Sequence, residues 1–212
     1  MKPYYDHAGI VIYHGDCREI LPTLPKCDLL LTDPPYGIGM AGKKGDTRRA
    51  GYENFGWDET RPDHDAFYLM WQRSKEQVVW GGNYFVEELP PKMGWLVWDK
   101  GQRIAQSDGE LAYTSRDAAL RIFDDCGRER LDKDGAVHPT QKPIALMKWC
   151  LSLFPDARTV LDPYCGSGTT LIAAKAMGLT AIGIELHEPY CEIAAKRLSQ
   201  EVFDFQPERN CK

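Results

Sequence analysis

The sequence has 212 residues, 43% of them hydrophobic and 27% charged, which suits one globular domain with a sizeable core. No apolar run approaches the ~20 residues that span a bilayer, and residues 1–16 lack the apolar stretch of a signal peptide, so we expect a cytoplasmic protein without a membrane partner. The formal net charge of −5 weighs weakly against a nucleic-acid partner, although the distribution of charge matters more than its sum.

Strand-like and helix-like segments alternate along the chain. Short apolar runs predict strands over residues 10–13, 28–32, 77–80, 95–98, 158–161 and 180–185, with weaker candidates at 110–114 and 119–123. Amphipathic or capped segments predict helices over residues 17–24, 63–75, 143–154, 168–177 and 188–203. This alternation indicates an α/β protein with a mostly parallel, doubly wound sheet, in a single domain over residues 1–212.

Cysteine and histidine usage bears on disulfides and metals. The seven cysteines are odd in number and form no CxxC pair, and the five histidines do not cluster with them. We therefore expect neither a disulfide framework nor a metal site. Free thiols fit a reducing compartment.

The segment VLDPYCGSGTTLIAAKAMG, residues 160–178, has the order strand, tight loop and helix. Gly166 and Gly168 let the backbone pass close to a ligand, because they carry no Cβ atom. The next predicted strand ends at Glu185, whose carboxylate can accept both hydroxyls of a ribose. Leu171 stands where a dinucleotide fingerprint has its third glycine, so a pyrophosphate ligand, and with it a nicotinamide oxidoreductase, is disfavoured.

The motif Asp33-Pro34-Pro35-Tyr36 follows the strand predicted over residues 28–32, at the same sheet edge as the glycine loop. An exocyclic amine on a base is a poor nucleophile, because its lone pair is delocalised into the ring. Asp33 and the carbonyl of Pro34 could accept its two N–H groups and localise that lone pair, with the prolines fixing the carbonyl's direction. Tyr36 offers a flat face for stacking a base. For this motif alone, a proline turn capped by Asp33 is the alternative.

Together with DPYCGSGTT at residues 162–170, this motif resembles the amino-methylating DNA methyltransferases that use S-adenosylmethionine. The DPPY motif comes first and the cofactor loop last, which resembles the circularly permuted β group of that family. Other similar segments are HGDC, GGNYF, WDK and HPTQKP, which begin at residues 14, 81, 98 and 138. The resemblance implies a Rossmann-like methyltransferase fold with circularly permuted motif order, in a cytoplasmic enzyme of bacterial or phage type.

The resemblance also implies roles for individual residues. The catalytic motif would be Asp33, Pro34, Pro35 and Tyr36, with Tyr36 stacked on a flipped base. The residues that would hold S-adenosylmethionine are Asp16, Cys17, Asp33, Thr140, Lys142, Asp162, Cys165, Gly166, Ser167, Gly168, Thr169 and Glu185. Thr140 and Lys142 would lie at the methionine end, although a solvated residue beside a helix start is the alternative for Lys142. Direct methyl transfer needs no metal and no covalent enzyme intermediate.

Two irregular segments would face DNA. Residues 37–60 are long, rich in glycine and charged, which is typical of a mobile loop. Its basic residues Lys43, Lys44, Arg48 and Arg49 would meet the DNA backbone, with a solvated loop as the alternative. Residues 102–137 would form a short target-recognition insertion, which favours a short or relaxed recognition sequence and leaves room for a homodimer.

The resemblance favours adenine N6 as the acceptor. In the permuted group, DPPY resembles the adenine enzymes, whereas a serine in its first position resembles the cytosine enzymes. The expected function is site-specific DNA methylation, with or without a restriction enzyme as partner. Three alternatives stay open: an N4-cytosine DNA methyltransferase, an RNA base methyltransferase, and a non-catalytic module that binds S-adenosylmethionine or nucleic acid.

Overall fold

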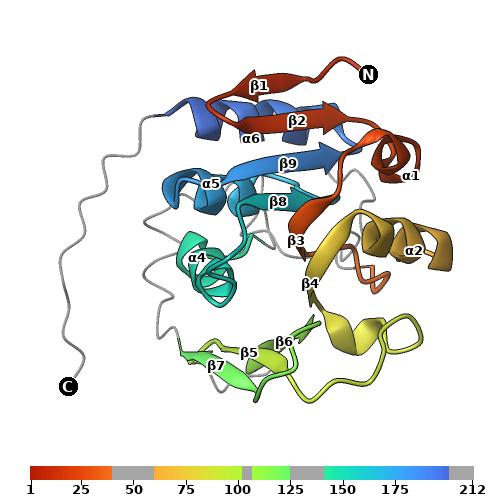
Figure 1. Cartoon of the computed structure of the whole chain (residues 1–212), viewed down its shortest axis with the longest axis vertical. Coiled ribbons are helices and arrows are strands. Elements are labelled where there is room, and N and C mark those ends of the chain that lie inside the picture. Colours follow the sequence, from red (N-terminus) through yellow and green to blue (C-terminus); the bar gives the residue numbers. More distant parts are fainter. Residues whose placement is uncertain (40–59, 102–106, 125–140, 201–212) are drawn as a thin grey trace.

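The computed structural model describes residues 1–39, 60–101, 107–124 and 141–200. In these residues one sheet has the strand order β1-β2-β9-β8-β3-β4-β6-β5-β7 (Figure 1). Its strands are β1 Tyr5–His7, β2 Ile10–His14, β3 Cys27–Thr32, β4 Ser74–Trp80, β5 Trp95–Asp99, β6 Gly109–Thr114, β7 Arg121–Asp124, β8 Thr159–Asp162 and β9 Thr180–Glu185.

The central strands are parallel. The neighbouring pairs β2–β9, β9–β8, β8–β3 and β3–β4 all run in one direction. β1 pairs antiparallel with β2, and β6 lies antiparallel to both β4 and β5. The predicted α/β architecture with a mostly parallel sheet is confirmed.

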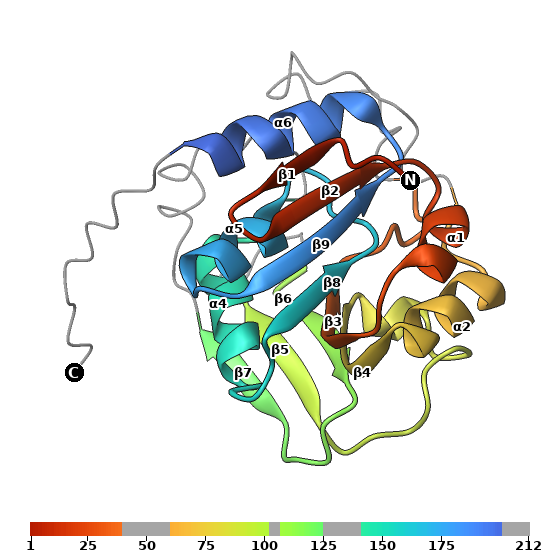
Figure 2. The same ribbon diagram turned by 45° about the horizontal axis from the view of Figure 1, so that its top comes forward.

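Helices cover both faces of the sheet (Figures 1 and 2). The helices α4, α5 and α6 pack into one buried cluster with the sheet, while α1 and α2, with the 3-10 turn η1, pack into the other. The bounds are α1 Cys17–Ile20, η1 Leu21–Thr23, α2 His64–Gln72, η4 Gly82–Tyr84, α4 Ile144–Ser152, α5 Thr169–Ala176 and α6 Glu188–Ser199. The sheet is therefore doubly wound.

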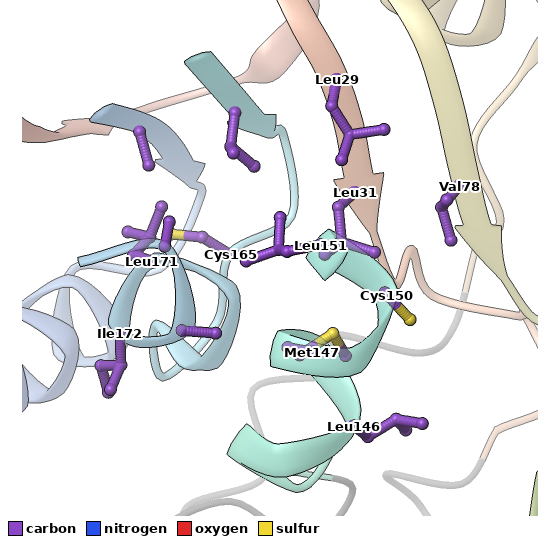
Figure 3. Close-up of a cluster of buried hydrophobic side chains, with 14 of the residues drawn as sticks. Leu29, Leu31, Val78, Leu146, Met147, Cys150, Leu151, Cys165, Leu171 and Ile172 are labelled. Atoms are coloured by element: carbon purple, nitrogen blue, oxygen red, sulfur yellow. The ribbon is translucent and has the colours of Figure 1, made fainter. Parts of the chain in front are cut away.

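β3 shows how the sequence builds this double cover. Leu29 and Leu31 join the cluster beneath α4 and α5, where Figure 3 shows them facing α4. Leu30 joins the cluster beneath α1 and α2, because successive side chains of a strand point to opposite faces. All three leucines have no exposed surface. A continuous apolar run is thus what a strand buried on both faces requires.

Local chemistry explains where the elements differ from the predicted bounds. The helix predicted over residues 63–75 begins after Asp63, whose carboxylate accepts the Ala66 N–H at 2.9 Å, and it ends at Gln72 because β4 already begins at Ser74. The segment predicted over residues 17–24 divides into α1 and η1, and Pro22 lies at the start of η1. The short edge strand β1 was not predicted.

Two further observations concern the described residues alone. None of their helices is long and apolar enough to cross a membrane. Their cysteines are free thiols, all of them buried: Cys17, Cys27, Cys150, Cys165 and Cys191.

Candidate active site

The candidate site lies at the carboxyl ends of four adjacent parallel strands, β2, β9, β8 and β3. Asp16 follows β2, Glu185 ends β9, Asp162 ends β8 and Asp33 follows β3. The chain leaves β8 for α5 on one face and leaves β3 for α2 on the other. The boundary between β8 and β3 is therefore the switch point of the sheet, the place where open α/β sheets bind ligands.

A direct hydrogen bond joins the two predicted motifs at this switch point. The hydroxyl of Thr32, the residue before Asp33, donates to Oδ1 of Asp162 at 2.7 Å. The Tyr164 N–H donates to the same oxygen at 3.2 Å. Burial raises the pKa of the Asp162 carboxyl to about 6, although these donors and the Thr170 hydroxyl act in the opposite direction. Two segments 130 residues apart in sequence thus share one buried carboxyl group.

Asp33 is held by donors on both of its oxygens. The Tyr36 hydroxyl donates to Oδ1 at 2.6 Å, and Nζ of Lys142 lies 2.5 Å from Oδ2. Nζ of Lys142 also lies 3.3 Å from the Tyr36 hydroxyl oxygen. The side chain of Asp33 keeps 25% of its surface exposed, whereas that of Lys142 keeps only 5%. The predicted catalytic residues Asp33 and Tyr36 are therefore brought together, with Pro34 buried and Pro35 half-buried between them.

The ring of Tyr36 is packed between aromatic and backbone neighbours. Tyr84 stacks on it with ring centroids 4.7 Å apart and planes inclined by 15°. Gly81 lies so close that a Cβ atom there would be 2.1 Å from Cε1 of Tyr36. Gly81 also has φ +67°, a conformation that favours glycine. Gly81 and Tyr84 of the GGNYF segment thus fix the position of the Tyr36 ring.

The glycine loop is hydrogen-bonded to the carboxylate of Glu185. Oε2 of Glu185 accepts the Gly166 N–H at 2.9 Å, and Oε1 accepts the His187 N–H at 2.8 Å. Burial raises the pKa of the Glu185 carboxyl to about 7, although these N–H groups act in the opposite direction. Gly166 has φ +49°, and a Cβ atom there would meet nothing within 4 Å. The loop therefore leaves open space beside a carboxylate, which fits a ligand with hydroxyl donors such as a ribose.

The rest of the loop is fixed by α6. A Cβ atom at Gly168 would lie 2.9 Å from Cβ of Ala194, so only glycine allows this approach without a shift. The Arg197 guanidinium donates to the backbone oxygen of Ser167 at 2.6 Å and to its hydroxyl at 3.0 Å. It also reaches the Thr169 hydroxyl at 3.4 Å. Ser167, Gly168 and Thr169 are thus held in place by packing and by one arginine.

The other predicted cofactor residues occupy different settings. The Asp16 carboxylate caps α1 by accepting the Arg18 N–H at 2.8 Å and pairs with the Arg18 guanidinium at 2.6 Å. Sγ of Cys17 donates to the Tyr164 hydroxyl at 3.3 Å. Cys165 is buried, and its N–H donates to the Ile184 carbonyl at 3.0 Å. Both cysteines are therefore structural neighbours of the site, and their thiols face protein atoms.

Several predictions lie outside the described residues. These are Thr140, the basic residues Lys43, Lys44, Arg48 and Arg49, nearly all of the loop over residues 37–60, and much of the insertion over residues 102–137. In the described ranges no group of three or more His, Cys, Asp or Glu side chains could hold a metal ion.

Sequence reasoning missed four residues that the structure places around the motifs. Glu110 on β6 lies 2.9 Å from Nζ of Lys142, and Lys100 after β5 lies 2.5 Å from the other oxygen of Glu110. Arg197 and Tyr84 are described above. Tyr84 lies within GGNYF and Lys100 within WDK, so both motifs were usable signals, but nothing in the sequence pattern singled out Glu110.

Several known proteins with similar sequences or folds are methyltransferases. A type II methyltransferase of Streptomyces caespitosus, M.ScaI, is 25% identical over 94% of this chain and 84% of its own length. The crystal structure of an M1.HpyAVI complex with S-adenosylmethionine covers 90% of this chain and all of its own, with a TM-score of 0.59 and 24% identity. The PvuII cytosine-N4-specific DNA methyltransferase covers 95% of this chain and 90% of its own, with a TM-score of 0.61 and 17% identity.

The family model for the DNA methylases of the N6/N4 type matches residues 59–196, which include β8, the glycine loop and Glu185, whereas β3 and Asp33 precede the matched range. The chain belongs to this family of S-adenosylmethionine-dependent DNA amino-methyltransferases. Family and fold together confirm the predicted resemblance and the predicted Rossmann-like methyltransferase fold.

Proposed function

We propose that the protein methylates N6 of adenine in DNA, at a base flipped out of the duplex. The observation that carries this proposal is the Thr32–Asp162 hydrogen bond at the switch point. It sets the acceptor motif at Asp33 directly beside the glycine loop, so an amine and a methyl donor bound to these two motifs would meet at one sheet edge.

The proposal assigns the target amine to Asp33. Its carboxylate and the Pro34 carbonyl accept the two N–H groups of the amine, which localises the nitrogen lone pair. Each carboxylate oxygen has two lone pairs, so the contacts with Tyr36 and Lys142 leave room for a further donor. Proton loss follows methyl transfer, when the nitrogen has become strongly acidic.

Tyr36 is proposed as the stacking platform for the flipped base. One face of its ring is now covered by Tyr84, which keeps 37% of its surface exposed. A base that stacks on this face takes the place of Tyr84. Extruding the base costs on the order of a few kcal/mol, which this stacking helps to offset.

The residues around the glycine loop fit S-adenosylmethionine. Glu185 is proposed to accept the ribose hydroxyls in the open space beside Gly166, and Asp16 to bind the adenine end. Asp162 is proposed to lie by the methionine end, together with Thr140 and the backbone of residues 165–169. When bound, S-adenosylmethionine supplies an electrophilic methyl group on a sulfonium.

The competing function is methylation of cytosine N4, which presents the same kind of amine. One solved relative in fold, the PvuII enzyme, is cytosine-N4-specific. The aspartate in the first position of DPPY favours adenine. In the permuted group, a motif with serine in this position resembles the cytosine enzymes instead. For partners, we propose DNA contacts from the basic residues 43–49 and a cytoplasmic location, with a homodimer as a further option.

The test is tritiated-methyl transfer from S-adenosylmethionine to unmethylated DNA, followed by nucleoside analysis. We expect the label in N6-methyl-2′-deoxyadenosine from DNA and none in a matched RNA. Label in N4-methylcytosine would overturn the choice of base, and label in RNA alone would overturn the choice of polymer. Sequencing of the methylated sites checks the prediction of a short or relaxed recognition sequence, which a long, strict site would contradict.

A further inference from the structure

A chain of alternating charges runs from the catalytic motif into the sheet. Nζ of Lys142 lies 2.5 Å from Oδ2 of Asp33 and 2.9 Å from Oε2 of Glu110, the latter as an ion pair without an aligned hydrogen bond. Nζ of Lys100 lies 2.5 Å from Oε1 of Glu110. The order is carboxylate, ammonium, carboxylate, ammonium, so the formal charges cancel.

Burial makes this pairing necessary. The side chain of Lys142 keeps 5% of its surface exposed, and that of Glu110 keeps 23%. A buried charge is costly unless an opposite charge and hydrogen bonds compensate it, and removing one partner of such a pair leaves an uncompensated charge. The position of the Lys142 ammonium is therefore fixed by the two carboxylates on either side of it.

We propose that Lys142 is a positioning residue that keeps Asp33 ionised and correctly oriented for the target amine, and that Glu110 holds Lys142 in this place. The inference rests on the proposed role of Asp33 as acceptor. With the Tyr36 hydroxyl on Oδ1 and the Lys142 ammonium on Oδ2, the carboxylate cannot rotate without losing a hydrogen bond. A protonated Asp33 would present a donor to the amine, where the mechanism needs an acceptor.

The electrostatic surroundings of Asp33 support this role. Burial raises the pKa of the Asp33 carboxyl and the nearby Glu110 carboxylate acts in the same direction, whereas the Lys142 ammonium and the Tyr36 hydroxyl lower it. Asp162 is a further acidic neighbour across the switch point. Burial also acts to lower the pKa of Lys142, but Asp33, Tyr36 and Glu110 together hold it well above its usual value. Lys142 is thus the cation that opposes the protonation of Asp33 among these described neighbours.

The role of Glu110 follows from its own charge state. Burial acts to raise the pKa of Glu110, but Lys142 and Lys100 lower it to about 2. Glu110 is therefore ionised throughout the range in which a methyltransferase is assayed. It attracts the Lys142 ammonium from the side opposite Asp33, and Lys100 neutralises it in turn.

The decisive experiment is the pH dependence of the single-turnover methyl-transfer rate, at saturating S-adenosylmethionine and DNA. For Lys142→Met we expect the acidic limb of the profile to move upward by about 1–3 pH units, because an opposite charge within hydrogen-bond reach lowers an aspartate pKa by that amount. The rate then falls about 10- to 1,000-fold at a pH below the limb and recovers as the pH rises. Affinity for S-adenosylmethionine, measured by equilibrium dialysis, should stay within twofold.

Three further variants separate the effect of charge at this site from an effect on folding. Glu110→Gln preserves shape and removes a carboxylate that itself raises the pKa of Asp33, so its direct effect would move the limb downward. We expect a net upward movement, smaller than in Lys142→Met, because Lys142 loses the partner that holds it on Asp33. A downward movement would refute the role of Glu110. Lys142→Arg keeps the positive charge and should return the limb toward that of the wild type. Lys26→Met, at an exposed lysine in the turn before β3, is the matched control and should leave the profile unchanged.

Two results would overturn the proposal. One is a methyl-transfer rate that falls by the same factor at every pH in Lys142→Met and Glu110→Gln, with the acidic limb of the pH profile unmoved. The other is an unmoved limb with weakened binding of S-adenosylmethionine, which would place Lys142 at the methyl donor instead. The wild-type product identifies the methylated base separately, so an N4-methylcytosine product would refute the proposed acceptor while the profiles still decide the role of Lys142.

Discussion

Glu185 is a buried carboxyl group with a pKa of about 7, raised by its burial. A ribose hydroxyl donates best to the ionised form, so proton release should be linked to binding of S-adenosylmethionine. If only the ionised form binds, the dissociation constant is about tenfold larger at pH 6 than at pH 8, since the ionised fraction rises from about one eleventh to about ten elevenths. Isothermal titration across this range checks the prediction.

Glu185→Gln provides the control for that measurement. It should bind S-adenosylmethionine more weakly at pH 8, and its dissociation constant should vary much less with pH. Asp162, with a pKa of about 6, contributes only a smaller change near the lower end of the range. An affinity of the wild-type protein that is constant between pH 6 and pH 8 would contradict the assigned role of Glu185.

Gly81 is predicted to matter for catalysis because of the Tyr36 ring. Gly81→Ala places a Cβ atom where the ring now lies, so Tyr36 must move and its hydrogen bond to Asp33 is lost. We expect a fall in methyl-transfer rate of up to about 100-fold, the size of effect known for small displacements in active sites. Affinity for S-adenosylmethionine should change little.

Gly178→Ala is the matched control for backbone strain. Gly178 lies just after α5 with φ +70°, close to the +67° of Gly81, but a Cβ atom there meets nothing within 4 Å. Both variants should lose about 1–2 kcal/mol of stability from the left-handed conformation. Equal methyl-transfer rates for the two folded variants would show that the position of Tyr36 is not critical.

At the scale of the elements, Asp28 ties three strands together at the end of the sheet opposite the site. Its Oδ2 accepts the N–H groups of Arg158 and Thr159, both at 3.0 Å, and the Thr159 hydroxyl at 2.9 Å. Its Oδ1 pairs with Nζ of Lys75 on β4 at 2.7 Å. One side chain of β3 thus fixes the positions of β8 and β4, whose other ends carry or flank the site.

Asp28→Ala should therefore destabilise the fold by about 2–4 kcal/mol, because hydrogen bonds to a charged group are lost and backbone donors are left unpaired. Lys75, followed by the backbone N–H of Arg158, holds the pKa of Asp28 well below its ordinary value of 3.8. The stabilisation from Asp28 is complete at a pH above the ordinary pKa of 3.8. It is lost as the pH falls toward the lower pKa that Asp28 has in the folded protein.

Urea unfolding at pH 7 and at about pH 3 measures both effects. The difference in the free energy of unfolding between the wild type and Asp28→Ala should be smaller at the lower pH. Asp156→Ala, at an exposed turn residue, is the control and should stay within about 0.5 kcal/mol of the wild type. A difference that widens at low pH would contradict the account of Asp28.

The elements also show what the sequence could predict. The strands of the parallel core were found because β3, β8 and β9 are apolar runs bounded by polar residues or glycine. The end of α2 was misplaced because residues 73–75 fit a helical period, while their pairing with β3 is a long-range interaction that periodicity does not register. β1 was missed because a three-residue edge strand carries too little pattern.

For the molecule as a whole, the motifs predicted the parts of the site that lie at strand ends. Asp33, Asp162 and Glu185 each follow or end a predicted strand, and parallel strands bring such residues to one edge. Glu110 was not predictable in this way, because it meets Lys142 through the antiparallel order β4-β6-β5, which no local signal specifies. Lys142 was predicted near the cofactor, and the structure adds a contact between its ammonium and Asp33 that the sequence did not indicate.

The central claim is that Asp33 activates the target amine, and one comparison tests it most directly. Single-turnover methyl transfer to DNA is measured for the wild type and Asp33→Ala, both saturated with S-adenosylmethionine. The account predicts that Asp33→Ala binds S-adenosylmethionine normally and transfers no detectable methyl group, while the wild type forms N6-methyl-2′-deoxyadenosine. Equal transfer rates for the two proteins would contradict it.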